Sequence, residues 1–194
     1  MKKITLKLAS IHIKDLPRTV PLAAASLKAQ LDSVDAISRR LDVSIPEYII
    51  DHSASFISED LCGNIPEMIG FSTYLWNRHL VVEICRIIKS KFPSVILFAG
   101  GAEATALPLT LLDSAPLDFV VKGEGEIVLT EVMNKLLNAD PLDGIPGVLL
   151  KGAELDPEKD QQPVMDLNVL PSPFLTHTID PGRYRADLWW ELSR

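Results

Sequence analysis

Three short stretches of small and polar residues follow apolar runs, and together they could bind a ligand. They are residues 72–77 (STYLWN), 100–103 (GGAE) and 123–126 (GEGE). Paired glycines, as in the second stretch, let a bulky flat or phosphate-bearing ligand approach the backbone, because no Cβ stands in the way. Gly-Gly also occurs in tight turns without any ligand. The hydroxyls of Ser72 and Thr73 could hydrogen-bond a ligand or, equally well, cap the following helix.

Other kinds of chemistry find little support in the sequence. Cys62 and Cys85 are the only two cysteines, without CxxC spacing or a paired histidine, so we expect two reduced, largely buried thiols and no metal site. The first predicted strand is followed by no G-x-G-x-x-G, which disfavours a flavin or nucleotide site. A receiver-type signalling domain would need an acidic cluster there, and only Asp15 is available. We expect His52 and His79 to be surface residues or helix caps.

The charge and hydropathy patterns limit the partners. The chain has 194 residues, with 19 Lys and Arg against 26 Asp and Glu, for a formal charge of −7. The basic residues are scattered, which argues against nucleic acid. No apolar run approaches the roughly 20 residues of a membrane span, and the N-terminus leads into an alternating pattern rather than a signal-peptide block. We therefore expect a cytoplasmic protein without a membrane span.

Alternating strand-like and helix-like segments predict the framework that positions the three stretches. The pattern indicates parallel βαβ units, and Pro46 in the second strand places that strand at an edge. The predicted strands are residues 4–13, 43–50, 68–71, 95–98 and 118–121, with 147–151 as a possible addition. The predicted helices are residues 22–41, 79–92, 108–112 and 126–138. We therefore predict an α/β fold with a flavodoxin-like (Rossmann-like), doubly wound, parallel five-stranded sheet.

In such a sheet, ligands bind beyond the carboxyl ends of the strands, where the strand order reverses. The loops after the first, third, fourth and fifth predicted strands are therefore the candidate site. We expect a larger side chain at Gly100 or Gly101 to remove ligand binding selectively, with a positive-φ turn requirement as the competing interpretation.

The last forty residues differ in composition from the rest. They contain Pro163, Pro171, Pro173 and Pro181 and end near Trp189-Trp190. We predict a domain over residues 1–155 and, over 156–194, a linker leading to a further domain. We expect this linker to dock only partly, leaving some of Trp189 and Trp190 exposed or held by a neighbouring molecule.

The three stretches, read with the strands before them, resemble a known family. IGFSTYLWN (residues 69–77), FAGGAE (98–103) and VKGEGE (121–126) are similar to the amino-terminal cobalamin-binding domain of cobalamin-dependent radical SAM proteins, including the anaerobic magnesium-protoporphyrin IX monomethyl ester oxidative cyclase group. In that family, a Ser-x-Leu-type motif and a Gly-Gly line the slot for the dimethylbenzimidazole tail. Here the motif falls on residues 72–74, with Tyr74 in place of Leu, and the loop at residues 17–22 resembles the strip beneath the corrin.

The resemblance implies a set of cobalamin-binding residues. They are Pro17, Arg18, Val20, Pro21 and Leu22; Ser72, Thr73, Tyr74, Leu75, Trp76 and Asn77; Gly100, Gly101 and Glu103; and Gly123, Glu124, Gly125 and Glu126.

One departure concerns the lower axial ligand of cobalt. Many cobalamin domains carry Asp-x-His-x-x-Gly after the first strand, and this sequence has no such string. His12 lies near that place but precedes Asp15 and lacks the glycine, so we interpret it as a strand-end residue. The resemblance then implies base-off cobalamin without a protein histidine ligand.

A second departure concerns catalysis. Residues 170–173 (LPSP) match a Leu-Pro-x-Pro segment that, in the family, leads into a barrel bearing CxxxCxxC. The chain stops at Arg194 before such a motif, so we expect no catalytic residue, four-iron cluster or S-adenosylmethionine site in it. The resemblance implies that a longer parent enzyme would perform methyl transfer or oxidative cyclisation. The alternative is a cobalamin-free scaffold or interaction domain of the same class.

Overall fold

The computed structural model describes residues 3–13, 19–154, 161 and 163–184. Its strands are β1 (Ile4–His12), β2 (Leu41–Ser44), β3 (Glu47–Ile49), β4 (Met68–Ser72), β5 (Ile96–Gly100), β6 (Phe119–Val121) and β7 (Val148–Leu150). Its helices are α1 (Leu22–Ser33), α2 (Asp35–Ser38), α3 (Ala54–Cys62), α4 (Arg78–Lys91), α5 (Ala102–Ala106), α6 (Pro108–Ser114) and α7 (Gly125–Leu137), followed by the 3-10 turn η2 (Leu167–Val169).

All of these strands form one sheet in the order β2-β1-β4-β5-β6-β7, with β3 also paired to β1. Every pairing is parallel except that of β6 with β7. The chain leaves β1 toward β2 on one side and returns to β4 on the other. The order therefore reverses at β1, and the crevice beyond the carboxyl ends of β1 and β4 is the expected place for a ligand.

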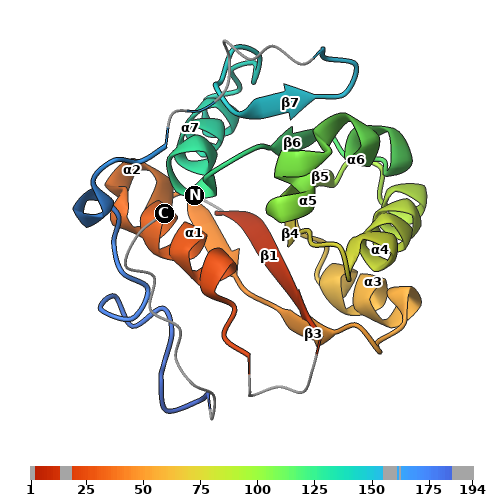
Figure 1. Cartoon of the computed structure of the whole chain (residues 1–194), viewed down its shortest axis with the longest axis horizontal. Coiled ribbons are helices and arrows are strands. Elements are labelled where there is room, and N and C mark those ends of the chain that lie inside the picture. The colour runs from red at the N-terminus through yellow and green to blue at the C-terminus, as the bar shows by residue number, and fades with distance from the viewer. Residues whose placement is uncertain (1–2, 14–18, 155–160, 162, 185–194) are drawn as a thin grey trace.

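The helices cover both faces of the sheet (Figure 1). On one face, α1, α2 and α7 pack on a core that includes Leu6, Phe98 and Phe119. On the other, α3, α4, α5 and α6 pack on a core that includes Ile69 and Leu97. Adjacent strand residues enter opposite cores because side chains alternate along a strand. Burial on both faces explains why β4 and β5 read as almost continuous apolar runs in the sequence.

The α/β fold and the parallel order are confirmed, but two boundaries differ from prediction. The described sheet has seven strands instead of five, because the predicted second strand divides at Pro46 into β2 and β3 and the possible strand at residues 147–151 is present as β7. The strand β7 pairs antiparallel with β6, which was not predicted. The backbone oxygen of Pro46 still accepts from Ser10 N, so the division keeps the segment at the edge of the sheet.

The first helix is shorter than predicted. It ends at Ser33, Val34 is extended, and α2 follows before Leu41 begins β2. Leu31, Ile37 and Leu41 all contact the same core. Their helix-like spacing therefore continued through the break and concealed it. The prediction also missed α3, whose Ser53 side chain caps the helix by accepting from Phe56 N, and the short α5.

The cysteines, the helices and the described part of the predicted linker bear on three smaller predictions. Both cysteines are free and buried, as expected. No helix within the described ranges is long and apolar enough to cross a membrane. In the predicted linker, Pro173 and Ile179 are buried whereas Met165 and Leu175 are exposed, so this part docks only partly. Trp189 and Trp190 lie outside the described residues.

Candidate cofactor site

A cavity of about 600 Å³ lies at the carboxyl ends of β1, β4, β5 and β6, between the sheet and the helices α1 and α7. Most of its wall is apolar or glycine, and Ser26, Ser72, Tyr74 and Glu126 add polar atoms. Its lining residues are Leu8, Ala9, Leu22, Ala23, Ala24, Ser26, Leu27, Gly70, Phe71, Ser72, Tyr74, Phe98, Gly100, Gly101, Val121, Gly123, Gly125, Glu126 and Leu129. A site of this size and composition suits a largely apolar, flat group held by a few polar contacts.

The inner part of the cavity is shaped by a glycine opposite an aromatic ring. Gly70 of β4 pairs with Phe98 of β5, and a Cβ added at Gly70 would lie only 2.3 Å from Cζ of that ring. The missing side chain therefore makes room for Phe98, which stacks on Phe119 with ring centroids 4.9 Å apart and an interplanar angle of 5°. Stacked rings are a stable apolar surface against which a ligand can lie.

The two glycines after β5 serve different purposes. An added Cβ at Gly100 would meet only ordinary contacts, at 3.7 Å from Val121 O and 3.9 Å from Val121 Cβ. Gly101 has φ +95°, and a Cβ there would lie 2.8 Å from Thr73 O. A Cβ would therefore fit at Gly100, which lines the cavity, whereas the turn requires glycine at position 101.

The loop after β4 is built by its own buried polar side chains. Thr73 donates from both its amide and its hydroxyl to Gly100 O, at 2.7 Å each. The Asn77 side chain accepts from Tyr74 N at 2.8 Å and donates to Ser72 O at 3.0 Å. Both residues are fully buried, so they shape the loop instead of facing a ligand. The Thr73 hydroxyl thus joins the end of β4 to the end of β5 and caps no helix, a role that neither interpretation of this hydroxyl anticipated.

Two aromatic residues of this loop stack at the mouth of the cavity. The rings of Tyr74 and Trp76 lie 4.6 Å apart at an interplanar angle of 3°. Tyr74 lines the cavity, whereas Trp76 is half exposed. Burial raises the pKa of the Tyr74 hydroxyl, so this hydroxyl is a hydrogen-bond donor at neutral pH.

The third stretch connects the cavity to the helix layer. A Cβ at Gly125 would lie 2.9 Å from Leu27 Cδ2, so this glycine allows α1 and α7 to meet. Gly123 donates its amide to Thr105 Oγ1 at 3.0 Å, and Glu124 accepts from Val164 N at 2.9 Å. Glu126 is buried and lines the cavity.

The histidines take no part in this cavity. His12 is buried at the end of β1, where its Nε2 lies 3.3 Å from the Glu47 carboxylate, as expected for a strand-end residue. His52, His79 and His177 are also described by the structure, and none of the four lines the cavity. Within the described ranges, no cluster of three or more His, Cys, Asp or Glu side chains could hold a metal ion.

The predicted site residues divide into three groups. Those that line the cavity are Leu22, Ser72, Tyr74, Gly100, Gly101, Gly123, Gly125 and Glu126. Those outside its wall are Val20, Pro21, Thr73, Leu75, Trp76, Asn77, Glu103 and Glu124, of which Glu103 pairs with Arg78 at 3.2 Å. Pro17 and Arg18 lie outside the described residues.

Sequence reasoning missed the wall formed by α1 and the strands. The missed residues are Leu8, Ala9, Ala23, Ala24, Ser26, Leu27, Gly70, Phe71, Phe98, Val121 and Leu129. The one available signal was the run of small residues that opens α1, because small side chains let a ligand approach a helix.

Comparison with known proteins agrees with this geometry. Residues 14–133 match the family model described as the B12 binding domain. The chain belongs to the B12-binding domain family. The resemblance inferred from the sequence motifs is therefore confirmed at the level of the family.

Relatives of the chain are larger proteins. It is 25% identical over 165 residues to the cobalamin-dependent radical SAM methyltransferase TokK of Streptomyces tokunonensis, covering 83% of this chain and 24% of that protein. It is 28% identical over 149 residues to the hopanoid C-3 methylase of Methylococcus capsulatus, covering 72% of this chain and 29% of that protein. With the anaerobic magnesium-protoporphyrin IX monomethyl ester cyclase of Synechocystis it shares 27% over 141 residues, covering 71% and 25%. The chain thus spans about a quarter of the length of these relatives.

Solved structures share the fold. The cobalamin-dependent S-adenosylmethionine radical enzyme OxsB with aqua-cobalamin bound matches with a TM-score of 0.63 and 21% identity, over 86% of this chain and 25% of that one. The radical S-adenosylmethionine methyltransferase TsrM of Kitasatospora setae matches with a TM-score of 0.57 and 20% identity, over 75% of this chain and 28% of that one.

Proposed function

We propose that this domain binds cobalamin in its base-off form, with the nucleotide tail in the cavity between β4, β5 and α1. The observation that carries the proposal is the apolar cavity of about 600 Å³ at the topological switch point, where Gly100 leaves its wall open. Membership of the B12-binding domain family supports the choice of ligand.

The residues present fit a flat apolar group. Gly100 and Val121 would line one side of the tail, the ring of Phe98 would support its inner end, and Leu22 and Leu27 of α1 would cover it. Ser72 and Tyr74 would supply hydrogen bonds at the mouth. When bound, cobalamin supplies a cobalt centre that accepts and donates a methyl group, and the protein supplies binding and orientation.

The positions of the imidazoles support the proposed absence of a histidine ligand. His12 contacts Glu47, and the other three histidines also lie outside the cavity wall. An imidazole must reach the metal through a free ring nitrogen to serve as a ligand. In the proposed function, none of these four imidazoles would bind the cobalt.

The wider role follows from the relatives. We propose that the domain holds cobalamin for a radical SAM barrel of the same polypeptide, in a cytoplasmic enzyme that transfers methyl groups. TokK, the hopanoid methylase and TsrM, methyltransferases or methylases by name, support methyl transfer over cyclisation. Iron–sulfur chemistry and S-adenosylmethionine binding would belong to that barrel.

Titration of the purified chain with hydroxocobalamin tests the proposal. We expect saturable binding at micromolar concentration with a base-off absorption spectrum, and the same spectrum in His12→Gln. A wild-type spectrum of histidine-ligated cobalamin that disappears in His12→Gln would overturn the base-off assignment. No binding at high micromolar concentration would instead favour a cobalamin-free scaffold.

A further inference from the structure

Two carboxylates outside the cavity fasten the segment that follows the sheet. We call residues 163–184 the strap. Near its start, Val164 N donates to Glu124 Oε2 at 2.9 Å. At its end, Tyr184 donates its hydroxyl to Glu47 Oε1 at 3.0 Å, and Arg183 Nη2 lies 3.3 Å from the same oxygen. The strap is therefore tied at β3, which pairs with β1, and at the loop after β6, which lies toward the other edge of the sheet.

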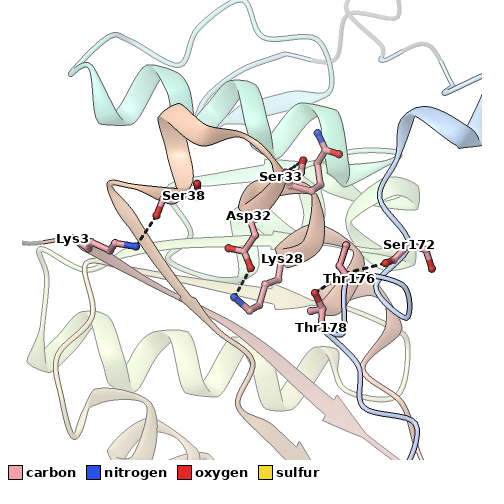
Figure 2. Close-up of polar contacts among 9 residues, drawn as sticks. Lys3, Lys28, Asp32, Ser33, Ser38, Ser172, Thr176 and Thr178 are labelled. Carbon is pink, nitrogen blue, oxygen red and sulfur yellow. Dashed lines mark hydrogen bonds and ion pairs between the residues drawn. The ribbon is translucent and has the colours of Figure 1, made fainter.

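Between these ties, the strap has ordered turns of its own. Thr176 donates from its amide and its hydroxyl to Ser172 O, at 3.0 Å each, and Ile179 N donates to Pro173 O at 2.9 Å. Ile179 is only 2% exposed. Figures 1 and 2 both show the strap along the outer side of α1, where Figure 2 draws its threonine and serine contacts beside the α1 residues Lys28 and Asp32. In both views the strap thus runs beside α1, and the other side of α1 packs on the sheet.

This position bears on the cavity, because α1 forms its outer wall through Leu22, Ala23, Ala24, Ser26 and Leu27. A segment that is tied at both ends and runs beside a helix limits how far that helix can move away from the sheet. Loosening the strap should therefore let α1 move and the cavity open more frequently.

Glu47 is the residue on which the strap and the sheet converge. Its side chain is 5% exposed and contacts His12 at the end of β1 as well as Arg183 and Tyr184 of the strap. A buried carboxylate is costly unless it is paired and hydrogen-bonded, so these partners are needed together. The same carboxylate therefore holds the end of β1 and the end of the strap.

We propose that Glu47 is a positioning residue for the cofactor cavity: by fastening the strap over α1, it sets the rate at which cobalamin enters and leaves. The ligand named here rests on the proposed function. The attachment of the strap and its effect on α1 do not, and they are tested without cobalamin.

Hydrogen exchange of the cobalamin-free 194-residue chain tests the attachment. We expect Glu47→Gln to raise amide exchange in the strap and in α1 by roughly tenfold, the size expected for loss of one charge-assisted contact. Asp60→Asn is the matched control, because Asp60 also accepts a tyrosine hydroxyl, that of Tyr48 at 2.7 Å, but from α3 on the opposite face. Unchanged exchange in the strap of Glu47→Gln, or an equal rise in Asp60→Asn, would overturn the proposal.

Release of cobalamin tests the coupling. Glu47→Gln should release bound cobalamin several times faster than wild type with an unchanged absorption spectrum, and Tyr184→Phe should lie between them. Asp60→Asn should release it at the wild-type rate even where its melting temperature falls. Release that follows melting temperature across all three variants would show a merely structural role and refute the coupling. If wild type binds no cobalamin, the proposed function fails. The hydrogen-exchange experiment then still tests whether Glu47 fastens the strap and restrains α1.

Discussion

Gly100 and Gly101 are adjacent, but an added methyl group would meet different surroundings at each. At Gly100 the nearest atoms are at ordinary van der Waals distance, and the space beyond them is the cavity. At Gly101 the backbone has φ +95° and the methyl group would collide with Thr73 O. The Gly-Gly motif alone could not show whether a glycine is there to leave room for a ligand or to adopt a positive φ, because both requirements favour glycine.

We predict that substitutions at the two positions separate ligand binding from stability. Gly100→Ala should change the free energy of unfolding by less than about 0.5 kcal/mol. Gly100→Phe should fill the cavity and weaken cobalamin binding by roughly 1–3 kcal/mol, the cost of overpacking a filled site. Gly101→Ala should lose about 1 kcal/mol or more of stability before any ligand is added. Titrations with cobalamin and thermal melts of the three variants provide the measurements.

The opposite pattern would contradict this division. If Gly100→Phe keeps full affinity, the nucleotide tail does not occupy the space at Gly100. If Gly101→Ala melts like wild type, the turn tolerates a Cβ and Gly101 has no special requirement. From the sequence, a larger side chain at either glycine was expected to remove ligand binding selectively. In the structure, only Gly100 can test this expectation, because any side chain at Gly101 also strains the turn.

Among the elements, β4 and β5 depend on one close pair. The methyl group of Gly70→Ala would collide with the outer edge of the Phe98 ring, 2.3 Å from its Cζ, so the ring would have to leave its stack on Phe119. We predict a loss of about 1–3 kcal/mol of unfolding free energy, measured by denaturant titration. The double variant Gly70→Ala with Phe98→Leu should recover part of this loss, because the smaller side chain leaves room.

A glycine elsewhere provides the control. Gly63 has φ −55°, and an added Cβ would meet only carbonyl oxygens at 3.6 and 3.7 Å, so Gly63→Ala should be nearly neutral. Equal losses at Gly70 and Gly63 would show a general cost of replacing glycine. Strictly additive effects of Gly70→Ala and Phe98→Leu would show that the ring and the glycine do not interact.

The elements found from the sequence are those whose signal is local. The strands β4 and β5 are short continuous apolar runs, and α4 combines a regular apolar stripe with Pro93 after its end. The break after α1 was concealed because residues on both sides contact one core. The cavity wall was only half found, since Leu8, Leu27 and Phe98 look like ordinary core residues until the sheet places them at one opening. Thr73 and Asn77 were assigned to the ligand because a polar loop residue gives no sign of bonding to its own loop.

At the scale of the whole molecule, the pKa values of two cysteine thiols and two tyrosine hydroxyls are all raised. Burial raises the pKa of Cys62 and of Cys85. Burial, the hydrogen bond to Asp60 and the charge of Asp60 raise the pKa of Tyr48. Burial, the hydrogen bond to Glu47 and its charge raise the pKa of Tyr184 to about 12. Each group therefore holds its proton more tightly in the folded chain than in the unfolded one.

The sign of the pH dependence follows from proton linkage. Below about pH 8.5 all four groups are protonated in both states, so their contribution to stability is fully present. As the pH rises, the unfolded thiols ionise first and the unfolded tyrosines ionise near pH 10, while the folded groups keep their protons. Unfolding then releases protons, and each further rise in pH favours it. This contribution of Tyr184 is lost as the pH rises from about 10 through about 12.

We predict that the urea midpoint falls above about pH 8.5 and more steeply between pH 10 and 12. Tyr184→Phe removes one titrating hydroxyl together with its bond to Glu47, so this variant should be less stable at pH 8 but lose less between pH 10 and 12. Tyr48→Phe should also reduce the fall of the urea midpoint between pH 10 and 12, because this variant lacks the hydroxyl beside Asp60. A midpoint that stays constant to pH 11, or a wild-type slope in both variants, would show that these hydroxyls do not hold their protons more tightly in the folded chain. Strap exchange measured at the same pH values would show whether the end tied to Glu47 loosens before the sheet unfolds.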